Sequence, residues 1–224
     1  MSEGNLTARE RIARRAAAEL QNGQVVNLGI GLPALVPRYL GGLEIYLHSE
    51  NGILGFGPAD PDNLDPLLVN AGKQAIGLKP GAAVFDSASS FAMIRGGRID
   101  VAILGALQVS VRGDLANWAV PGEAVLGVGG AMDLARGARR VIVTMTHQDR
   151  QGRCKIVDAL ELPPTALGVV DMIITELAVF RCGEPLELLE LQPEVSYEEL
   201  RARTDVPFRV AAGTSAGGRY TPAQ

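Results

Sequence analysis

Glu50 is the residue of this sequence best suited to chemistry, because it lies between a predicted strand and a glycine-rich loop. Residues 43–48 alternate between apolar and polar types, which predicts a strand with one buried face and with His48 on its polar face. The following loop, residues 51–58, contains three glycines, and glycines let a backbone approach a ligand closely. A glutamate is ionised at neutral pH and can attack a carbonyl without a general base. Taken alone, the pattern also fits the commoner case of a surface glutamate in an Asn-Gly turn.

Two further glycine segments have residue types that suit ligand binding. Residues 127–133 form a glycine loop entering a predicted helix, where main-chain N–H groups could bind an oxyanion or a phosphate, although tight chain packing would need the same glycines. In residues 70–73, Lys73 follows a glycine and could meet a phosphate, although most such lysines are simply solvated.

A serine-histidine-acid triad is a competing interpretation, because His48 and Ser49 adjoin Glu50 and several serines follow Asp86. Neighbouring side chains on a strand point to opposite faces, so His48 and Ser49 do not form a ready pair. The sequence has no GxSxG elbow, and we expect a structural role for His147. We therefore do not expect a triad.

A dinucleotide-binding fold is the strongest rival, because Gly29-x-Gly31-x-x-Ala34 after a strand fits the loose glycine fingerprint. Glu50 would then bind a ribose. That interpretation explains neither the loop after Glu50 nor the second glycine loop at residues 127–130.

The remaining elements predict how these residues are positioned. Thr7 and Glu10 form a capping box for a helix that ends before Gly23, and Ser196 with Glu199 caps a last helix that ends before Pro207. A short helix capped by Ser89 or Ser90 should end at residues 96–97, and residues 178–191 should form a hairpin. We expect strands at residues 24–28, 43–48, 82–85, 101–104, 141–144 and 172–175, and we expect the last four of them to be buried.

Strands separated by helices predict an α/β fold with an open, largely parallel sheet, since parallel neighbours need crossover connections. We expect one domain over residues 1–210 and a flexible tail over residues 211–224, which is rich in glycine and alanine.

Composition excludes several classes of function. The 224 residues are 47% hydrophobic with a formal charge of −4, which argues against nucleic acid as a partner. No apolar run is long enough to span a membrane. Only Cys154 and Cys182 occur, without a metal-ligand spacing, so we expect no metal and a cytoplasmic protein.

Several segments together resemble the B (beta) subunits of the 3-oxoacid CoA-transferases, in order from about Thr7 to Phe208. They are residues 27–33 (NLGIGLP), 49–52 (SENG), 70–73 (NAGK), 90–97 (SFAMIRGG), 113–118 (GDLANW) and 129–134 (GGAMDL). The resemblance implies a three-layer fold with helices on both faces of the sheet. His48 stands where many members have glutamine, a departure that we do not expect to touch the chemistry.

The resemblance also implies a site and a reaction. Glu50 matches the family's nucleophile, and the main-chain N–H of Gly130 matches an oxyanion donor. Residues expected near coenzyme A are Asn27, Gly29, Gly31, Asn51 and Lys73. No cofactor would be bound permanently, because the coenzyme A thioester is a substrate.

The implied enzyme is an A2B2 heterotetramer with a separate A (alpha) subunit. It would move coenzyme A from succinyl-CoA to a 3-oxoacid such as acetoacetate, by a ping-pong route through a glutamyl-CoA thioester on Glu50. A 3-oxoadipate or short-chain fatty acid CoA-transferase is the alternative. More distant alternatives are an effector-binding sensor domain and a dinucleotide-binding dehydrogenase.

Overall fold

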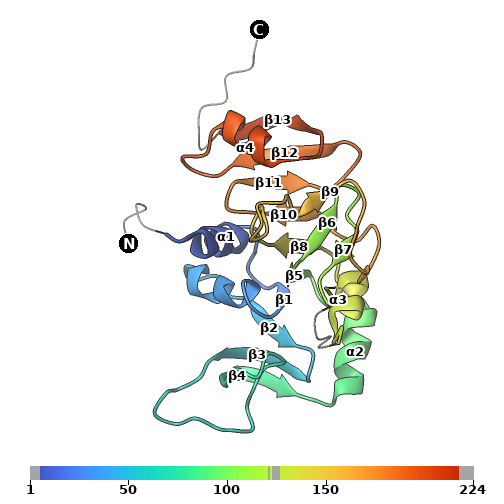
Figure 1. The fold of residues 1–224 in the computed structure, drawn as a ribbon. Coiled ribbons are helices and arrows are strands. Elements are labelled where there is room, and N and C mark those ends of the chain that lie inside the picture. The colour runs from blue at the N-terminus through green and yellow to red at the C-terminus, as the bar shows by residue number, and fades with distance from the viewer. Residues whose placement is uncertain (1–5, 121, 123–126, 217–224) are drawn as a thin grey trace.

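The computed structural model describes residues 6–120, 122 and 127–216, and its centre is a ten-stranded sheet (Figure 1). Across the sheet, the strands are β13 (Phe208–Ala216), β12 (Leu186–Leu191), β11 (Ala178–Arg181), β10 (Met172–Ile174), β8 (Val141–Thr144), β5 (Val101–Gly105), β1 (Val25–Leu28), β2 (Tyr46–Ser49), β3 (Ile53–Pro58) and β4 (Ile76–Val84).

The central strands β10, β8, β5, β1 and β2 run parallel to one another, as predicted. Strands β3 and β4 continue one side of the sheet as an antiparallel hairpin. On the other side, β11 and β12 form the hairpin predicted for residues 178–191, and β13 pairs parallel to β12.

Helices cover both faces of the sheet, which confirms the three-layer arrangement (Figure 1). One face carries α1 (Ala8–Ala17) and the 3-10 helix η2 (Pro33–Tyr39), which place Ile12 and Val36 in a buried apolar cluster. The other face carries α2 (Ser87–Arg95), α3 (Ala131–Gly137), α4 (Tyr197–Arg203) and a small sheet of β7 (Leu115–Ala116), β6 (Gln108–Ser110) and β9 (Ile156–Val157). Ile94, Leu134 and Leu200 belong to the second buried cluster.

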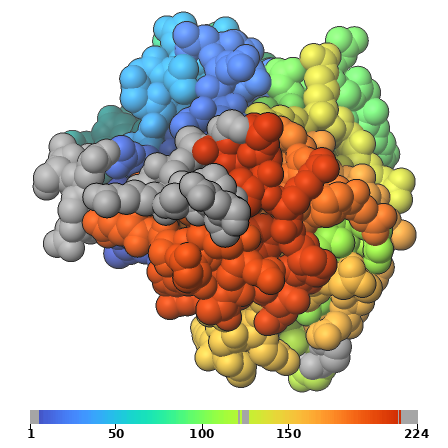
Figure 2. Space-filling model, turned by 90° about the horizontal axis from the view of Figure 1, so that it is seen from above, coloured from blue at the N-terminus to red at the C-terminus, as the bar shows by residue number. Residues whose placement is uncertain are grey.

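The first helix forms where its capping box predicts. The Thr7 hydroxyl accepts from the main-chain N–H of Glu10, and the Glu10 carboxylate accepts from the main-chain N–H of Thr7 at 2.9 Å. Farther along α1, Arg15 donates to Glu190 at 2.8 Å, next to the end of β12. The N-terminal segment therefore lies against the C-terminal part of the chain, as Figure 2 shows in blue and orange.

Strand β4 differs from its prediction. The apolar residues 82–85 predicted a buried strand, whereas β4 is a long edge strand whose Leu78 and Val84 are exposed. An apolar run of residues does not distinguish a central strand from an edge strand. Lys79 and Pro80, earlier in β4, are residue types that are common in edge strands.

Two predicted boundaries also move. Asp86, not a serine, caps α2, and its carboxylate accepts from the main-chain N–H of Ser89 at 2.7 Å. The predicted tail begins too early, because β13 pairs with β12 as far as Ala216, while residues 217–224 lie outside the described residues. Among the described residues, no helix is long and apolar enough to cross a membrane.

Candidate active site

Glu50 lies in the turn that joins β2 to β3, at the carboxyl end of a parallel strand as predicted. The N–H of Gly52 donates to the carbonyl of Ser49 at 2.9 Å and closes this turn. Gly52 has a φ of 115°, and a Cβ at this position would lie 2.0 Å from the Phe85 carbonyl oxygen. Only glycine fits here, so the Glu50 turn can pack directly onto the chain that enters α2.

Asn27 is the first side chain to touch the Glu50 carboxylate. Asn27 lies on β1 opposite His48 of β2. Because side chains alternate along a strand, the side chains of His48 and Glu50 lie on the same face of the sheet as that of Asn27. The Asn27 Nδ2 donates to Oε2 of Glu50 at 3.3 Å and to the His48 carbonyl at 3.2 Å. Asn27 is only 1% exposed, so the amide supports Glu50 from inside the protein.

Gly130 lies on another side of the same carboxylate, just before α3. A Cβ built on Gly130 would lie 3.1 Å from Cγ and 3.4 Å from Oε1 of Glu50. It would also lie 3.4 Å from the Phe91 ring of α2. The structure therefore brings together Glu50 and Gly130, which the sequence predicted to act together.

His48 is buried, which corrects the expectation that it lies on an open polar face. Its Nε2 lies 3.0 Å from Oγ of Ser90, and its Nδ1 lies 3.1 Å from Nδ2 of Asn27. Helix α2 covers this face of β2 and places Ser90 there, fully buried. Burial lowers the pKa of His48 to about 4, so the ring is neutral at neutral pH.

The contact between His48 and Ser90 does not make a serine nucleophile. Ser90 has no exposed surface, and a histidine with so low a pKa is a weak base. Ser49 lies on the opposite face, where its hydroxyl accepts from the N–H of Ala71 at 2.8 Å. The expectation that His48 and Ser49 are not paired is confirmed.

The segment containing Lys73 packs against the Glu50 turn. Asn51, the residue after Glu50, donates from its side chain to the carbonyl of Val69 at 2.8 Å. Lys73 has a φ of 61°, unusual for a residue other than glycine, and its N–H donates to the Asn70 carbonyl at 2.9 Å. Contact of Asn51 and Lys73 with coenzyme A remains a prediction.

Gly29 has a packing role and Gly31 has a turn role, and the sequence alone did not distinguish these two roles. A Cβ on Gly29 would lie 3.3 Å from the Ile103 carbonyl, so glycine lets β1 lie close to β5. Gly31 has a φ of 88° with open space around it, so it serves the turn before η2. Between them, Ile30 is 75% exposed. Their contact with coenzyme A also remains a prediction.

Sequence reasoning did not connect Ser90, a candidate helix cap, or Phe91 with Glu50, although the segment containing them was part of the family resemblance. Nothing in their residue types links them to residue 50, because the link depends on how α2 docks.

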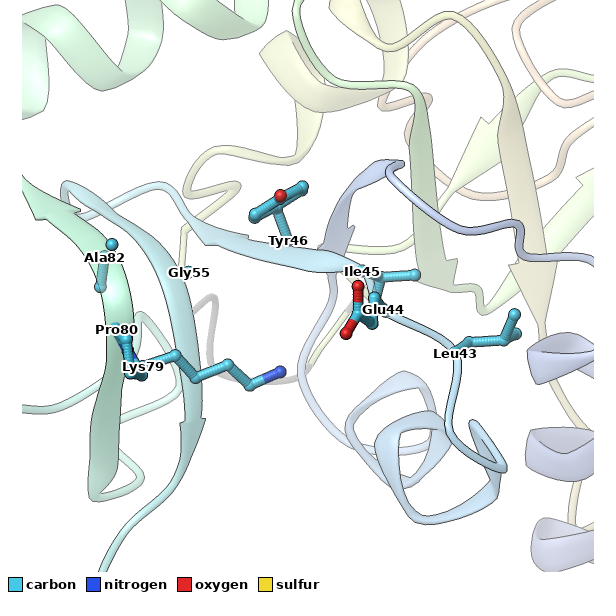
Figure 3. Close-up of a pocket in the computed structure, with 9 residues that line it drawn as sticks. Leu43, Glu44, Ile45, Tyr46, Gly55, Lys79, Pro80 and Ala82 are labelled. Carbon is cyan, nitrogen blue, oxygen red and sulfur yellow. The ribbon is translucent and has the colours of Figure 1, made fainter.

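A cavity of about 260 Å³ lies between the start of β2 and β4, away from the Glu50 carboxylate (Figure 3). Lys79 extends into it from β4 toward Glu44 and Ile45. Among the described residues, no group of histidine, cysteine, aspartate or glutamate side chains is arranged to hold a metal ion.

The fold and the site define an α/β protein that presents an acidic side chain at the carboxyl edge of a parallel sheet, between a buried amide and a glycine loop. The sequence matches the Coenzyme A transferase family over residues 9–202, and the chain belongs to this family. It is an enzyme chain, and the resemblance to the B (beta) subunits of 3-oxoacid CoA-transferases is confirmed.

Two bacterial relatives match over nearly their whole length. The B (beta) chain of the succinyl-CoA:3-ketoacid coenzyme A transferase of Helicobacter pylori is 50% identical over 204 residues, which are 90% of this chain and 99% of that protein. The beta chain of the acetate CoA-transferase of Escherichia coli is 51% identical over 209 residues, which are 92% of this chain and 96% of that protein.

A solved structure has the same fold. An acyl-CoA transferase from Escherichia coli O157:H7, in a thioester complex with CoA, is 25% identical with a TM-score of 0.71. The match covers 96% of this chain and 44% of that enzyme, so this chain spans less than half of the solved enzyme's length.

Proposed function

We propose that this chain is the B (beta) subunit of a CoA-transferase that moves coenzyme A from succinyl-CoA to a 3-oxoacid such as acetoacetate. The observation that carries the proposal is the Glu50 carboxylate, with Oε2 bound to Asn27 and Oε1 beside Gly130. The name of the Helicobacter pylori relative supports this choice of substrates.

Transfer begins when a Glu50 carboxylate oxygen attacks the thioester carbonyl of the donor. The C–S bond breaks, coenzyme A leaves as a thiolate, and a mixed anhydride remains on Glu50. The thiolate then attacks the glutamyl carbonyl and expels the donor acid, which leaves a glutamyl-CoA thioester. A carboxylate suits this role because it needs no base and the thioester is retained.

The acceptor acid reverses these steps. Its carboxylate attacks the glutamyl thioester and releases the thiolate, and the thiolate attacks the acceptor's carbonyl in the new anhydride, which frees Glu50. Each attack creates an oxyanion, and the main-chain N–H of Gly130 is the proposed donor to it. One such donor is typically worth about 3 kcal/mol of barrier.

The proposed partner is an A (alpha) subunit in an A2B2 heterotetramer in the cytoplasm. The names of both relatives, each given as one chain of a transferase, support a separate second chain. We assign to the A (alpha) subunit part of the acyl pocket and part of the coenzyme A site. The residues that we propose this chain contributes to the coenzyme A site are Asn27, Gly29, Gly31, Asn51 and Lys73.

Intact mass spectrometry tests the proposal. The chain, co-purified with its alpha partner, is mixed with succinyl-CoA and quenched rapidly, and fragmentation locates any adduct. We expect a CoA-sized increment on Glu50 and none in Glu50→Gln, because an amide is a poor nucleophile. Glu44→Gln is the matched control and should react normally. Absence of an adduct from the wild-type enzyme, with the thioester intact, would refute the proposal.

The rate of coenzyme A transfer to each acceptor acid then shows which acceptor the enzyme prefers. The assay offers acetoacetate, acetate and 3-oxoadipate to the enzyme that carries the glutamyl thioester. Fastest discharge by acetate would favour the specificity named for the Escherichia coli relative.

A further inference from the structure

A continuous line of buried polar side chains runs from α2 to the Glu50 carboxylate. Ser90 Oγ lies 3.0 Å from His48 Nε2, His48 Nδ1 lies 3.1 Å from Asn27 Nδ2, and Asn27 Nδ2 lies 3.3 Å from Glu50 Oε2. The three supporting side chains are at most 1% exposed. Ser90 and His48 present almost no surface to a substrate, so any effect of these two side chains on chemistry must act through Asn27 and Glu50.

The proton positions in this line follow from the atoms that meet. A neutral imidazole has one N–H donor and one acceptor nitrogen. Asn27 Nδ2 carries only hydrogens to donate, so the facing Nδ1 of His48 must accept. The ring proton is then on Nε2 and is donated to the Ser90 hydroxyl. Burial, which lowers the pKa of His48 to about 4, keeps the ring in this neutral form.

The same atoms determine the orientation of the Asn27 amide. Its NH2 group faces three acceptors, which are His48 Nδ1, the His48 carbonyl and Glu50 Oε2. A rotated amide would turn its oxygen toward the carbonyl and the carboxylate, and both would repel it. The Asn27 Oδ1 is buried without a hydrogen-bond partner among the described residues, so the NH2 contacts alone hold the amide.

We propose that His48 is a positioning residue for the transfer reaction, because its Nδ1 fixes the Asn27 amide that holds Oε2 of Glu50. Oε1, beside Gly130, is then the oxygen that attacks the thioester. When the thiolate attacks the glutamyl carbonyl, negative charge develops on Oε2, and the same Asn27 N–H faces it as a second donor besides the proposed Gly130 N–H. This inference rests on the proposed role of Glu50 as nucleophile.

Three variants test the role of His48 in the enzyme assembled with its alpha partner. His48→Phe keeps an aromatic ring beside Phe85 but removes both nitrogens. His48→Asn restores an acceptor close to the Nδ1 position. His147→Phe is the matched control, because His147 is equally buried but bonds to Thr175 and Thr204 in another part of the core.

The rate of adduct formation on Glu50, measured by rapid quench with succinyl-CoA, is the first readout. We expect His48→Phe to slow it about 100-fold, the usual scale for a misplaced reacting group, with little change in KM. His48→Asn should recover most of that loss, and His147→Phe should lower the melting temperature without slowing the reaction. Wild-type speed in His48→Phe, or equal slowing in His48→Asn, would overturn the inference.

The second readout requires no variant and no activity. Nitrogen-15 NMR of the histidine-labelled wild-type enzyme distinguishes the two neutral tautomers, and we expect His48 to carry its proton on Nε2. A proton on Nδ1 would overturn the inference even if Glu50 is the nucleophile. A wild-type enzyme with the expected tautomer but no adduct would instead refute the proposed function, and the inference with it.

Discussion

The side-chain amide of Asn27 donates a hydrogen bond to the carboxylate of Glu50 across two parallel strands, at 3.3 Å. The register of β1 and β2 sets this contact, because Asn27 lies opposite His48, two residues before Glu50. The donor to Glu50 is thus fixed by the sheet rather than by a loop.

We expect Asn27→Asp to slow adduct formation on Glu50 by about 100-fold. The substitution is nearly isosteric, but it replaces an N–H donor with a second carboxylate, and the two carboxylates repel each other. Asn22→Asp is the control, because Asn22 uses its side-chain oxygen to accept from the Glu44 N–H, which an aspartate can also do. Equal rates in the wild type and Asn27→Asp would show that the contact has no role in catalysis.

Gly130→Ala should slow adduct formation while leaving the melting temperature nearly unchanged. Gly130 has a φ of −81°, which alanine tolerates, but the new methyl group would lie 3.1 Å from Glu50 Cγ and displace the carboxylate. A loss of about 100-fold is expected from displacement of Glu50, the proposed nucleophile. Gly105→Ala is the control, since its nearest contact would be 3.9 Å away, and it should react like the wild type.

Gly52→Ala should destabilise the protein by roughly 3 kcal/mol or more, because a positive φ is combined with a direct clash against the Phe85 carbonyl. Gly81→Ala also has a positive φ, of 83°, but meets no atom within 4 Å. It should cost only about 1 kcal/mol. Chemical denaturation of both variants separates the clash from the backbone strain, and similar losses would contradict the geometry of the Glu50 turn.

Stability should fall as the pH is lowered from about 6.5 toward 4. Burial lowers the pKa of both His48 and His147 to about 4 in the folded protein, whereas an unfolded histidine titrates near ~6.5. The unfolded chain therefore binds protons first, and each histidine removes up to roughly 3 kcal/mol of stability by pH 4.

Thermal unfolding of the wild type and of His147→Gln over this pH range checks the effect. Carboxylates that titrate near pH 4 affect both proteins alike, so the difference isolates His147. The variant should show the flatter curve, and parallel curves would contradict the assigned pKa.

Much of the fold and part of the site could be predicted from the sequence. The capping box at Thr7 depends on residues three positions apart, and the strand before Glu50 depends on the alternation of neighbouring residues. Both can therefore be predicted from a short stretch of sequence. His48 shows where such reading fails. Alternation placed it on a polar face, but α2 covers that face and supplies Ser90 as a partner. Its place beside Asn27 and Glu50 depends on strand register and helix docking, which no local pattern specifies.

The candidate site is built from segments that are far apart along the chain: β1 with Asn27, the turn with Glu50, α2 with Ser90, and the loop with Gly130. During synthesis, Glu50 leaves the ribosome long before Gly130. Closing so long a stretch of chain costs entropy before any contact compensates for it. We therefore expect a nascent chain to remain chemically inert until the second half of the sheet has docked, and fragments that end before residue 130 to carry Glu50 without reactivity.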